Sequence, residues 1–302
     1  MMKLIRKLYT GVTWRNPVIN SVFKIIDIPD YAVRLLTGML GLPKYSIRVR
    51  SRGVANQFGG ALFQEQGIFM AELLSKYASL KPNSDVVEIG CGCGCGAVGL
   101  SRVLNGGSYR GMDIDAKSIV ACQKNSVFSG KNFQFSRMDL YSSQYNPVGK
   151  FKSSEFIFPY LDESADIVFL TSVFTHMLPL DVEHYIAEIS RILRPGGVLL
   201  CTVFLMDLGD EGASISFPYD RGNHRLHQET IPERAVGYMY PFFRDICQSV
   251  GLHPRHEPVY GNWRSHVMDG NDKNISFGQD ILVFEKRDKC ISGETAVRLE
   301  IL

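Results

Sequence analysis

The sequence contains no apolar run long enough to cross a membrane. Its longest candidate, Val198–Met206, has the length of a buried strand, whereas a membrane helix needs roughly 20 apolar residues. The basic residues near the start are not followed by the apolar segment and cleavage site of a signal peptide. Low-complexity stretches and internal repeats are also missing. These absences exclude collagen-like and largely disordered classes and lead us to expect a cytoplasmic protein.

Cysteine pairs of the kind that build disulfide or zinc scaffolds are missing as well. The seven cysteines are an odd number, and Cys91, Cys93 and Cys95 alternate with glycines. Secreted disulfide frameworks have an even number of spaced cysteines, and zinc sites usually combine two closely spaced pairs. We therefore expect reduced thiols that fill a loop and no metal site. A metal held by the cysteine trio is the weaker alternative.

The composition is that of an ordinary globular protein, but the charge is unevenly distributed. The 302 residues are 45% hydrophobic and 21% charged, and this length fits one large α/β domain with additions or two smaller domains. Residues 1–52 hold ten Lys or Arg against Asp27 and Asp30, which gives +8, so the rest of the chain carries −6. Such a segment can meet a membrane surface, a nucleic acid or an anionic substrate, or be the solvated face of two amphipathic helices.

Hydrophobic periodicity divides the chain into an N-terminal segment, an alternating part and a mixed last third. Residues 1–60 combine short apolar clusters with prolines and glycines, which predicts short helices rather than one long helix. Residues 61–205 alternate helical and strand patterns, which is typical of parallel βαβ units with helices on both faces of a sheet. Residues 206–235 are rich in Gly, His, Asp and Arg and are interpreted as an inserted cap.

The patterns also give the bounds of individual elements. The expected strands are Val86–Ile89, Tyr109–Met112, Phe133–Met138, Ala165–Leu170, Gly197–Leu205, Pro258–Tyr260 and Asp280–Phe284. Helices are expected to stop before Pro82, to cover Ala116–Phe128, to stop at Pro195, and to open at Pro241 and end at Gly251.

The most specific chemistry lies in the run Glu88-Ile89-Gly90-Cys91-Gly92-Cys93-Gly94, where a strand turns through three glycines into a helix. Each glycine lacks a Cβ, so the backbone can turn sharply and approach a ligand closely. The spacing differs from the G-x-G-x-x-G of dinucleotide enzymes, and no Lys-Ser or Lys-Thr follows as in a phosphate loop. The loop therefore favours a nucleoside cofactor without a pyrophosphate.

Two acidic residues follow at the ends of the next two strands. Asp113 lies where a carboxylate can accept hydrogen bonds from both hydroxyls of a ribose. Asp139 follows one strand later, where an acid can take the adenine amino group while the apolar Leu140 covers the ring. The carboxyl ends of parallel strands meet at one sheet edge, so loop and acids together predict one nucleoside crevice. Each aspartate alone is equally well explained as a helix cap or turn residue.

These residues resemble the motifs of the class I S-adenosylmethionine-dependent methyltransferases, in particular a bacterial branch often encoded near glycan and small-molecule pathways. The matching segments are Glu88–Gly94, Asp113, Asp139, Asp166–Val168 with Thr171–His176, and Arg191–Gly197. The resemblance covers residues 83–205 well and the segment that ends at Phe284 loosely.

The resemblance implies a doubly wound α/β fold with a seven-stranded, mostly parallel sheet whose last strand is antiparallel. We expect three parts: a basic helical extension or lid (1–60), the methyltransferase domain (61–286, with an inserted cap and acceptor loop at 206–235) and a tail (287–302). The resemblance implies S-adenosylmethionine as methyl donor and S-adenosylhomocysteine as product. The implied cofactor contacts are Glu88, Gly90, Cys91, Gly92, Gly94, Asp113, Ile114, Asp139, Leu140 and Thr171, with the glycine loop along the methionine part, Asp113 at the ribose, and Asp139 and Leu140 at the adenine.

A base is needed only where the methyl acceptor must lose a proton, as a hydroxyl does. His176 stands just beyond the fourth strand and is the predicted general base, because neutral imidazole takes a proton near pH 7. The alternative for His176 is a cap of the helix that begins near Pro179. His224 and His227, in the predicted cap, are further candidates for the base. For the cysteine trio, a thiol relay in metalloid methylation is a further alternative.

The predicted function is methyl transfer to a hydroxyl, or less favourably an amine, of a small molecule or glycan. The chain lacks the Asn/Asp-Pro-Pro-aromatic motif of nucleobase-methylating relatives, which disfavours nucleic acid as acceptor. Leu170-Thr171-Ser172 stands where catechol-type enzymes carry a magnesium ligand. Two alternatives stay open: a non-catalytic cofactor-binding subunit of a partner, and a lipid methyltransferase held at a membrane by residues 1–52. The acceptor and the oligomeric state are not predicted.

Overall fold

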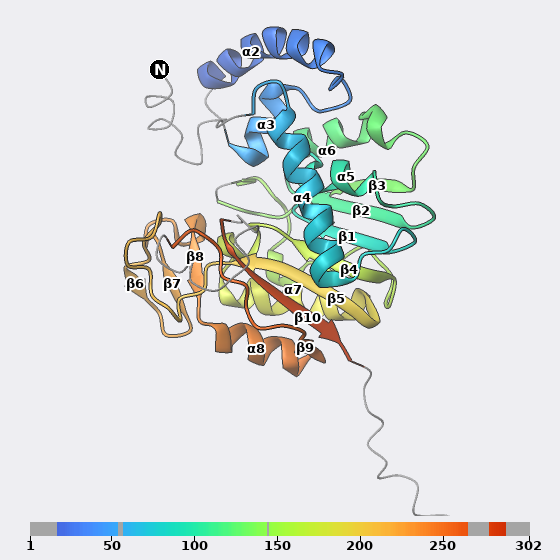
Figure 1. Cartoon of the computed structure of the whole chain (residues 1–302). Coiled ribbons are helices and arrows are strands. Elements are labelled where there is room, and N and C mark those ends of the chain that lie inside the picture. The colour runs from blue at the N-terminus through green and yellow to red at the C-terminus, as the bar shows by residue number, and fades with distance from the viewer. Residues whose placement is uncertain (1–16, 54–56, 144, 265–277, 288–302) are drawn as a thin grey trace, which may run out of the picture.

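The computed structural model describes residues 17–53, 57–143, 145–264 and 278–287. Seven strands form one sheet in the order β3-β2-β1-β4-β5-β10-β9, in which β10 runs antiparallel to both of its neighbours (Figure 1). The strands are β1 (Asp85–Ile89), β2 (Ser108–Asp113), β3 (Phe133–Arg137), β4 (Ala165–Leu170), β5 (Leu193–Val203), β9 (Leu252–Pro254) and β10 (Asp280–Lys286). The predicted fold, a doubly wound and mostly parallel sheet with an antiparallel last strand, is confirmed.

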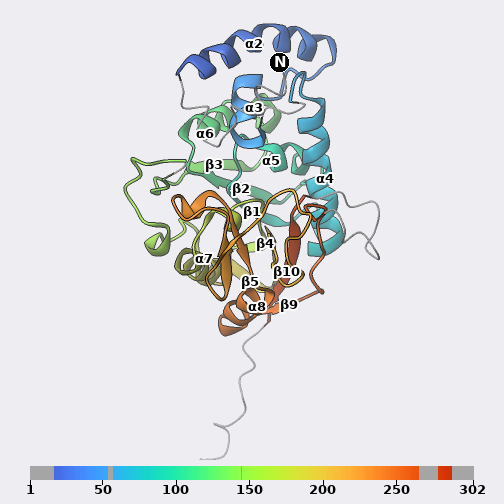
Figure 2. The ribbon, with the colours of Figure 1, turned by 90° about the vertical axis from the view of Figure 1, so that its left-hand side faces the viewer.

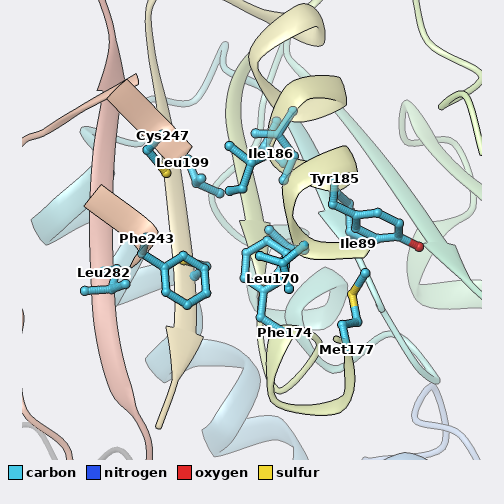
Figure 3. Packing of buried hydrophobic residues seen from close by; sticks show 14 of the residues in the cluster. Ile89, Leu170, Phe174, Met177, Tyr185, Ile186, Leu199, Phe243, Cys247 and Leu282 are labelled. Carbon is cyan, nitrogen blue, oxygen red and sulfur yellow. The ribbon is translucent and has the colours of Figure 1, made fainter. Parts of the chain in front are cut away.

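Helices cover both faces of this sheet because its central strands are apolar on both sides. On β1, Val86 packs in one buried cluster with helices α4 (Ala61–Ala78), α5 (Cys95–Leu100) and α6 (Ala116–Gln123), whereas Val87 packs in another with α7 (Pro179–Ile192) and α8 (Tyr240–Ser249). Figure 3 shows the second cluster, in which Leu199 of β5 lies near Ile186 of α7 and Phe243 of α8. The core therefore has two layers, one on each side of the sheet.

The N-terminal segment folds as a long helix α2 (Pro17–Leu36) and a short helix α3 (Tyr45–Arg52). The prediction of short helices alone was therefore wrong, since α2 has 20 residues and includes Pro29. The residue after this proline, Asp30, is fully buried and accepts bonds from Arg34 at 2.8 Å and from Arg48 of α3 at 2.5 Å, which ties this part of α2 to α3. In both whole-chain views α2 lies at the opposite end of the molecule from α8 (Figures 1 and 2).

The predicted cap holds regular structure of its own. Its strands form a small antiparallel sheet beside the large one (Figure 1). Its elements are β6 (Tyr219–Asp220), β7 (His224–Leu226), the 3-10 turn η5 (Pro232–Arg234) and β8 (Val236–Tyr238). The Tyr238 hydroxyl donates to the Met177 carbonyl at 2.6 Å, which fixes the cap against the chain that follows β4.

Three predicted element bounds need correction. The helix expected over Ala116–Phe128 ends at Gln123 and is followed by the 3-10 turn η2 (Ser126–Phe128), because the Asn125 side chain caps Val127. The strand expected to begin at Gly197 begins at Leu193, where β5 already pairs with β4.

The strand expected at 258–260 was wrong: β9 takes that place in the sheet, and Val259 makes a single bridge to Ile281 of β10. The chain leaves the ladder there because the Asp280 carboxylate takes the amide of Gly261 and the indole of Trp263.

Two further predictions concern membrane-spanning helices and the two ends of the chain. No helix among the described residues is long and apolar enough to span a membrane. The expected tail 287–302 lies outside the described residues from position 288 onward, as do residues 1–16 of the expected extension.

Candidate functional site

A loop with three left-handed glycines joins β1 to α5. Gly90, Gly92 and Gly94 have φ angles of 76°, 51° and 84°, a region that glycine adopts without strain. The Gly90 amide donates to the Met112 carbonyl at 2.8 Å, which ties the loop to β2. A Cβ added at Gly90 would lie 2.4 Å from Cγ2 of Val173. The glycines therefore allow the loop to pack closely against the chain that follows β4.

A cavity of about 380 Å³ lies at the carboxyl ends of β1, β2 and β4. The strand order reverses between β1 and β4, and open α/β sheets bind ligands at such points. One set of lining residues follows β1, β2 and β3 and is called here the strand-end group: Gly90, Gly92, Asp113, Ile114, Met138 and Leu140. A second set, called the polar group, comes from later segments: Tyr145, His176, Asp181, Tyr185 and Glu233.

Asp113 is held in place by the backbone around it. Its Oδ2 accepts the Gly92 amide and its Oδ1 accepts the Asp115 amide, both at 2.7 Å. Burial raises the pKa of Asp113 to about 6, although the backbone amides of Asp115, Gly92 and Ile114 favour the charged form. Each carboxylate oxygen keeps a second lone pair. The side chain is thus an oriented acceptor that can take two hydroxyl donors from a ligand.

Helix α3 packs over the glycine loop and completes this part of the wall. Arg50 and Ser51 both line the cavity, and Arg50 donates to the Asp115 carboxylate at 2.8 and 2.5 Å. The Ser51 hydroxyl lies 3.1 Å from the Cys93 sulfur. A Cβ added at Gly92 would lie 2.7 Å from the Ser51 Cβ. The N-terminal extension therefore reaches the strand-end group rather than the polar group.

His176 has the geometry of a base with a defined tautomer. Its Nδ1 lies 3.1 Å from the Glu233 carbonyl oxygen, and because a carbonyl only accepts, Nδ1 carries the proton. Nε2 is then unprotonated and lies 3.4 Å from the Tyr145 hydroxyl. Burial lowers the pKa of His176 from its ordinary value of 6.5, so the ring is neutral near pH 7. The alternative role as cap of α7 fails, since Leu178 is the N-cap and no side chain bonds there.

Two carboxylates make the polar group acidic. Glu233 comes from η5 of the cap and Asp181 from the first turn of α7. Burial and the neighbouring Glu233 raise the pKa of Asp181. A low-dielectric cavity with this charge favours a cationic ligand group.

Most of the residues predicted as a site are brought together by the fold, although their roles stay predictions. The cavity is lined by Gly90, Gly92, Asp113, Ile114, Leu140, Thr171 and His176. Glu88, Cys91, Gly94 and Asp139 do not line it. The cap was expected at the acceptor pocket, and its Glu233 lies in the wall beside His176.

Glu88 and Asp139 point to partners other than the cavity. The Glu88 carboxylate accepts the Tyr109 hydroxyl at 2.5 Å beneath the loop, and burial raises its pKa to about 7 against the opposing effects of Tyr109 and Arg52. Asp139 accepts Arg137 at 2.7 Å and the Asn146 amide at 3.2 Å. Glu88 therefore supports the loop from below, and Asp139 fixes the turn after β3.

The other candidate side chains also lie elsewhere. His224 bonds to Asn223 at 2.8 Å and His227 to the Ser216 carbonyl at 2.8 Å, and neither lines the cavity. No cluster of three or more metal-ligating side chains occurs in the described parts of the chain. Burial raises the pKa of the Cys91, Cys93 and Cys95 thiols, which disfavours the thiolate that a metal or a thiol relay needs.

Several lining residues were missed from the sequence. They include Arg50, Ser51, Tyr145, Asp181, Tyr185 and Glu233. Only one pair left a signal: Asp181 and Tyr185 are four residues apart on α7 and so share a helix face. The others reach the cavity from distant segments.

Comparison with known proteins agrees with this geometry. Residues 87–201 match a family model described as "Methyltransferase domain". The phthiotriol/phenolphthiotriol dimycocerosates methyltransferase of Mycobacterium leprae is 29% identical over 58% of this chain and 56% of its own length. The fatty-acid O-methyltransferase of Mycolicibacterium smegmatis is 32% identical over 39% of this chain and 36% of its own length. The chain thus spans between about a third and just over half of these relatives.

A solved structure gives the same fold at low sequence identity. The PH0226 protein of Pyrococcus horikoshii superposes with a TM-score of 0.51 at 14% identity, over 80% of this chain and 98% of its own. The sheet order, the glycine loop followed by Asp113, and the matched domain at residues 87–201 agree with one another. Residues 87–201 therefore form a methyltransferase domain within a sheet that has the fold of the class I S-adenosylmethionine-dependent methyltransferases.

Proposed function

We propose that this chain transfers the methyl group of S-adenosylmethionine to a hydroxyl oxygen of a lipid-like small molecule. The observation that carries the proposal is the position of His176, whose unprotonated Nε2 lies in the wall of the same cavity as Asp113. A positioned base is what a hydroxyl acceptor requires, whereas a carboxylate acceptor needs none. The lipid-like class is drawn from the relatives, which are named for methylating dimycocerosates and fatty acids.

The residues of the strand-end group fit the cofactor. The Asp113 carboxylate is oriented to accept ribose hydroxyls, and Ile114, Met138 and Leu140 offer apolar surface for the adenine ring. A cavity of about 380 Å³ is of the size of small-molecule sites. The bound cofactor supplies an electrophilic methyl on a sulfonium, and the carboxylates of Asp181 and Glu233 favour that positive charge.

The protein's part in the reaction is alignment, exclusion of water and removal of one proton. The acceptor oxygen forms a bond to the methyl carbon as the carbon–sulfur bond breaks. His176 Nε2 takes the hydroxyl proton, while the Glu233 carbonyl holds Nδ1–H and stabilises the imidazolium that forms. Tyr145, 3.4 Å from Nε2, is placed to bond the acceptor oxygen in turn.

A direct test offers the purified protein isotope-labelled S-adenosylmethionine with three acceptors: a long-chain secondary alcohol, a fatty acid and an oligosaccharide. We expect methyl transfer to the alcohol, and a loss of about 100-fold or more in His176→Asn. His227→Asn, which changes a half-buried histidine outside the cavity, is the matched control and should keep wild-type activity. Transfer to the oligosaccharide alone would contradict a lipid-like acceptor and support the glycan acceptor predicted from the sequence.

The same assay distinguishes the proposed function from the two alternatives left open by the sequence, a non-catalytic cofactor-binding subunit and a membrane-held lipid methyltransferase. A non-catalytic subunit would bind S-adenosylhomocysteine and methylate none of the acceptors. A membrane-held lipid methyltransferase would methylate the alcohol only when it is presented in vesicles. Cytoplasmic location and the lid role of residues 1–60 stay predictions.

A further inference from the structure

The side of α2 that faces away from the protein is apolar. The large apolar side chains on that side, named here the α2 outer face, are Val22 (47% exposed), Ile25 (68%), Ile28 (74%), Tyr31 (54%), Leu35 (54%) and Leu36 (86%). Their spacing of mostly three or four residues places them along one side of the helix. In both whole-chain views α2 is the outermost element at its end of the molecule (Figures 1 and 2).

This helix is apolar on its outer side as well as on its inner side, where Phe23 packs with Tyr45 and Val49 of α3, whereas a water-facing surface helix turns its charges outward. Asp30 and Arg34 are buried against α3. Asp27 is turned inward as well, and accepts both the amide and the hydroxyl of Ser46 at 2.7 Å. The inward side is thus fixed by ion pairs and hydrogen bonds, so the apolar side cannot rotate into the core. Contiguous exposed apolar surface of this kind marks an interaction site.

The charges around the α2 outer face select the partner. Lys24 is the charged residue among the exposed positions of α2, and the helix exposes no acid. In the described part of the segment, Arg34, Arg48 and Arg50 are buried in ion pairs with Asp30 and Asp115. Lys44, beside α2, has a side chain that is 52% exposed, so it and Lys24 give the surroundings of the α2 outer face a positive charge. Two such faces repel each other, whereas an anionic lipid surface attracts them. A helix with an apolar side and basic surroundings lies in the plane of a bilayer interface, with its apolar side among the acyl chains.

We propose that the α2 outer face docks this protein on an anionic lipid bilayer. Because α3 joins α2 to the cavity through Arg50 and Ser51, docking fixes the position of the cavity relative to the membrane surface. This proposal goes beyond the methyl transfer proposed above and does not rest on it, since docking requires neither the cofactor nor the base.

Sedimentation of the full chain with vesicles tests the proposal. The vesicles are phosphatidylcholine alone or mixed with phosphatidylglycerol, each at low and at high salt. We expect sedimentation with the mixed vesicles, reduced at high salt. The double variant Ile25→Gln/Ile28→Gln should weaken it by about tenfold or more, because each buried apolar side chain contributes that order of affinity. Val148→Gln/Leu161→Gln, at two positions that are 80% and 81% exposed elsewhere, is the matched control.

Each other result overturns the proposal. Failure to sediment with mixed vesicles excludes bilayer docking. An equal loss in the control variant shows that the α2 outer face is not the contact. If Ile25→Gln/Ile28→Gln abolishes a dimer seen in light scattering, and the protein does not bind vesicles, the occupant of the α2 outer face is a second copy.

Unchanged binding of S-adenosylhomocysteine shows that the variants are folded. Failure of methyl transfer would leave the sedimentation result intact.

Discussion

Arg50 of α3 forms a two-bond ion pair with Asp115, two residues beyond the ribose-binding candidate Asp113. Asp115 also caps α6 by accepting the amide and hydroxyl of Ser118 at 3.2 and 2.6 Å. The N-terminal extension is therefore bonded to the turn that orients Asp113. Loosening this pair affects the wall of the cavity as well as the position of α3.

Replacing Arg50 by alanine should destabilise the protein by roughly 1.5–3 kcal/mol, as expected for a charge-assisted hydrogen bond. It should also weaken binding of S-adenosylhomocysteine, because the wall loses α3. Urea unfolding and calorimetric titration measure the two effects. Arg244→Ala, which breaks an exposed pair with Asp245, should cost less than about 1 kcal/mol. Equal effects of the two variants would contradict the role given to Arg50.

The glycine at position 92 is predicted to be required by its neighbour on α3. Gly92→Ala introduces a Cβ 2.7 Å from the Ser51 Cβ, so it should weaken cofactor binding beyond the effect of its positive φ. Gly106→Ala has a φ of 91° and open space around it, and should cost only the backbone strain of about 1–2 kcal/mol. The second substitution Ser51→Gly should restore part of the binding lost in Gly92→Ala, as calorimetry can measure.

The affinity for S-adenosylhomocysteine should decrease as the pH is lowered below about 6. The pKa of Asp113 is raised to about 6 by burial, so below that pH the free protein carries a neutral acid that accepts ribose hydroxyls poorly. We expect a loss of up to about tenfold per pH unit below 6. Asp113→Asn should bind about 10- to 100-fold more weakly near neutral pH and lose this pH dependence. A variant that keeps the wild-type profile would remove Asp113 from the ribose site.

The rate of transfer to a hydroxyl should rise with pH to a plateau. Burial lowers the pKa of His176 from 6.5, so the protonated, inactive form accumulates only at acid pH. His176→Asn should reduce kcat by about 100- to 10,000-fold, and Tyr145→Phe by less. A pH profile of kcat that is unchanged in His176→Asn would show that another group takes the proton.

Folding stability should decline as the pH rises toward neutrality. Burial raises the pKa of Glu88 from 4.5 to about 7, so the folded protein retains a proton that the unfolded chain releases. The stabilisation of the folded state by this proton is fully present below about pH 4.5 and is lost as the pH rises through 7. Glu88→Gln should remove a decline of up to about 3 kcal/mol in urea unfolding between these limits. Asp113, with its raised pKa, contributes a similar decline in both proteins.

The sequence predicts the strand-end group well because its signals are local. A glycine between a strand and a helix, or an aspartate at a strand end, is placed by the fold itself. Asp139 shows the limit: its position follows from β3, but Arg137 and Asn146 determine where its carboxylate points.

The polar group and α3 depend on contacts between segments remote in the chain. Arg50 and Asp115 are 65 residues apart, and His176 and Glu233 are 57 apart. Nothing in the local pattern specifies such pairs. Helix α2 misled the prediction because Pro29 is typical of a helix end in the local pattern, whereas the ion pairs that Asp30 makes with Arg34 and Arg48 depend on α3.

The place of β10 has a consequence for synthesis of the chain. β10 lies between β5 and β9 although it is the last described strand, and β9 pairs with the sheet through it. Until the ribosome has released β10, the nascent protein carries β5 as an open edge with unpaired backbone groups. A chain interrupted before β10 therefore forms an incomplete sheet with an aggregation-prone open edge at β5 rather than a smaller stable domain. The finished molecule completes its sheet in a late step.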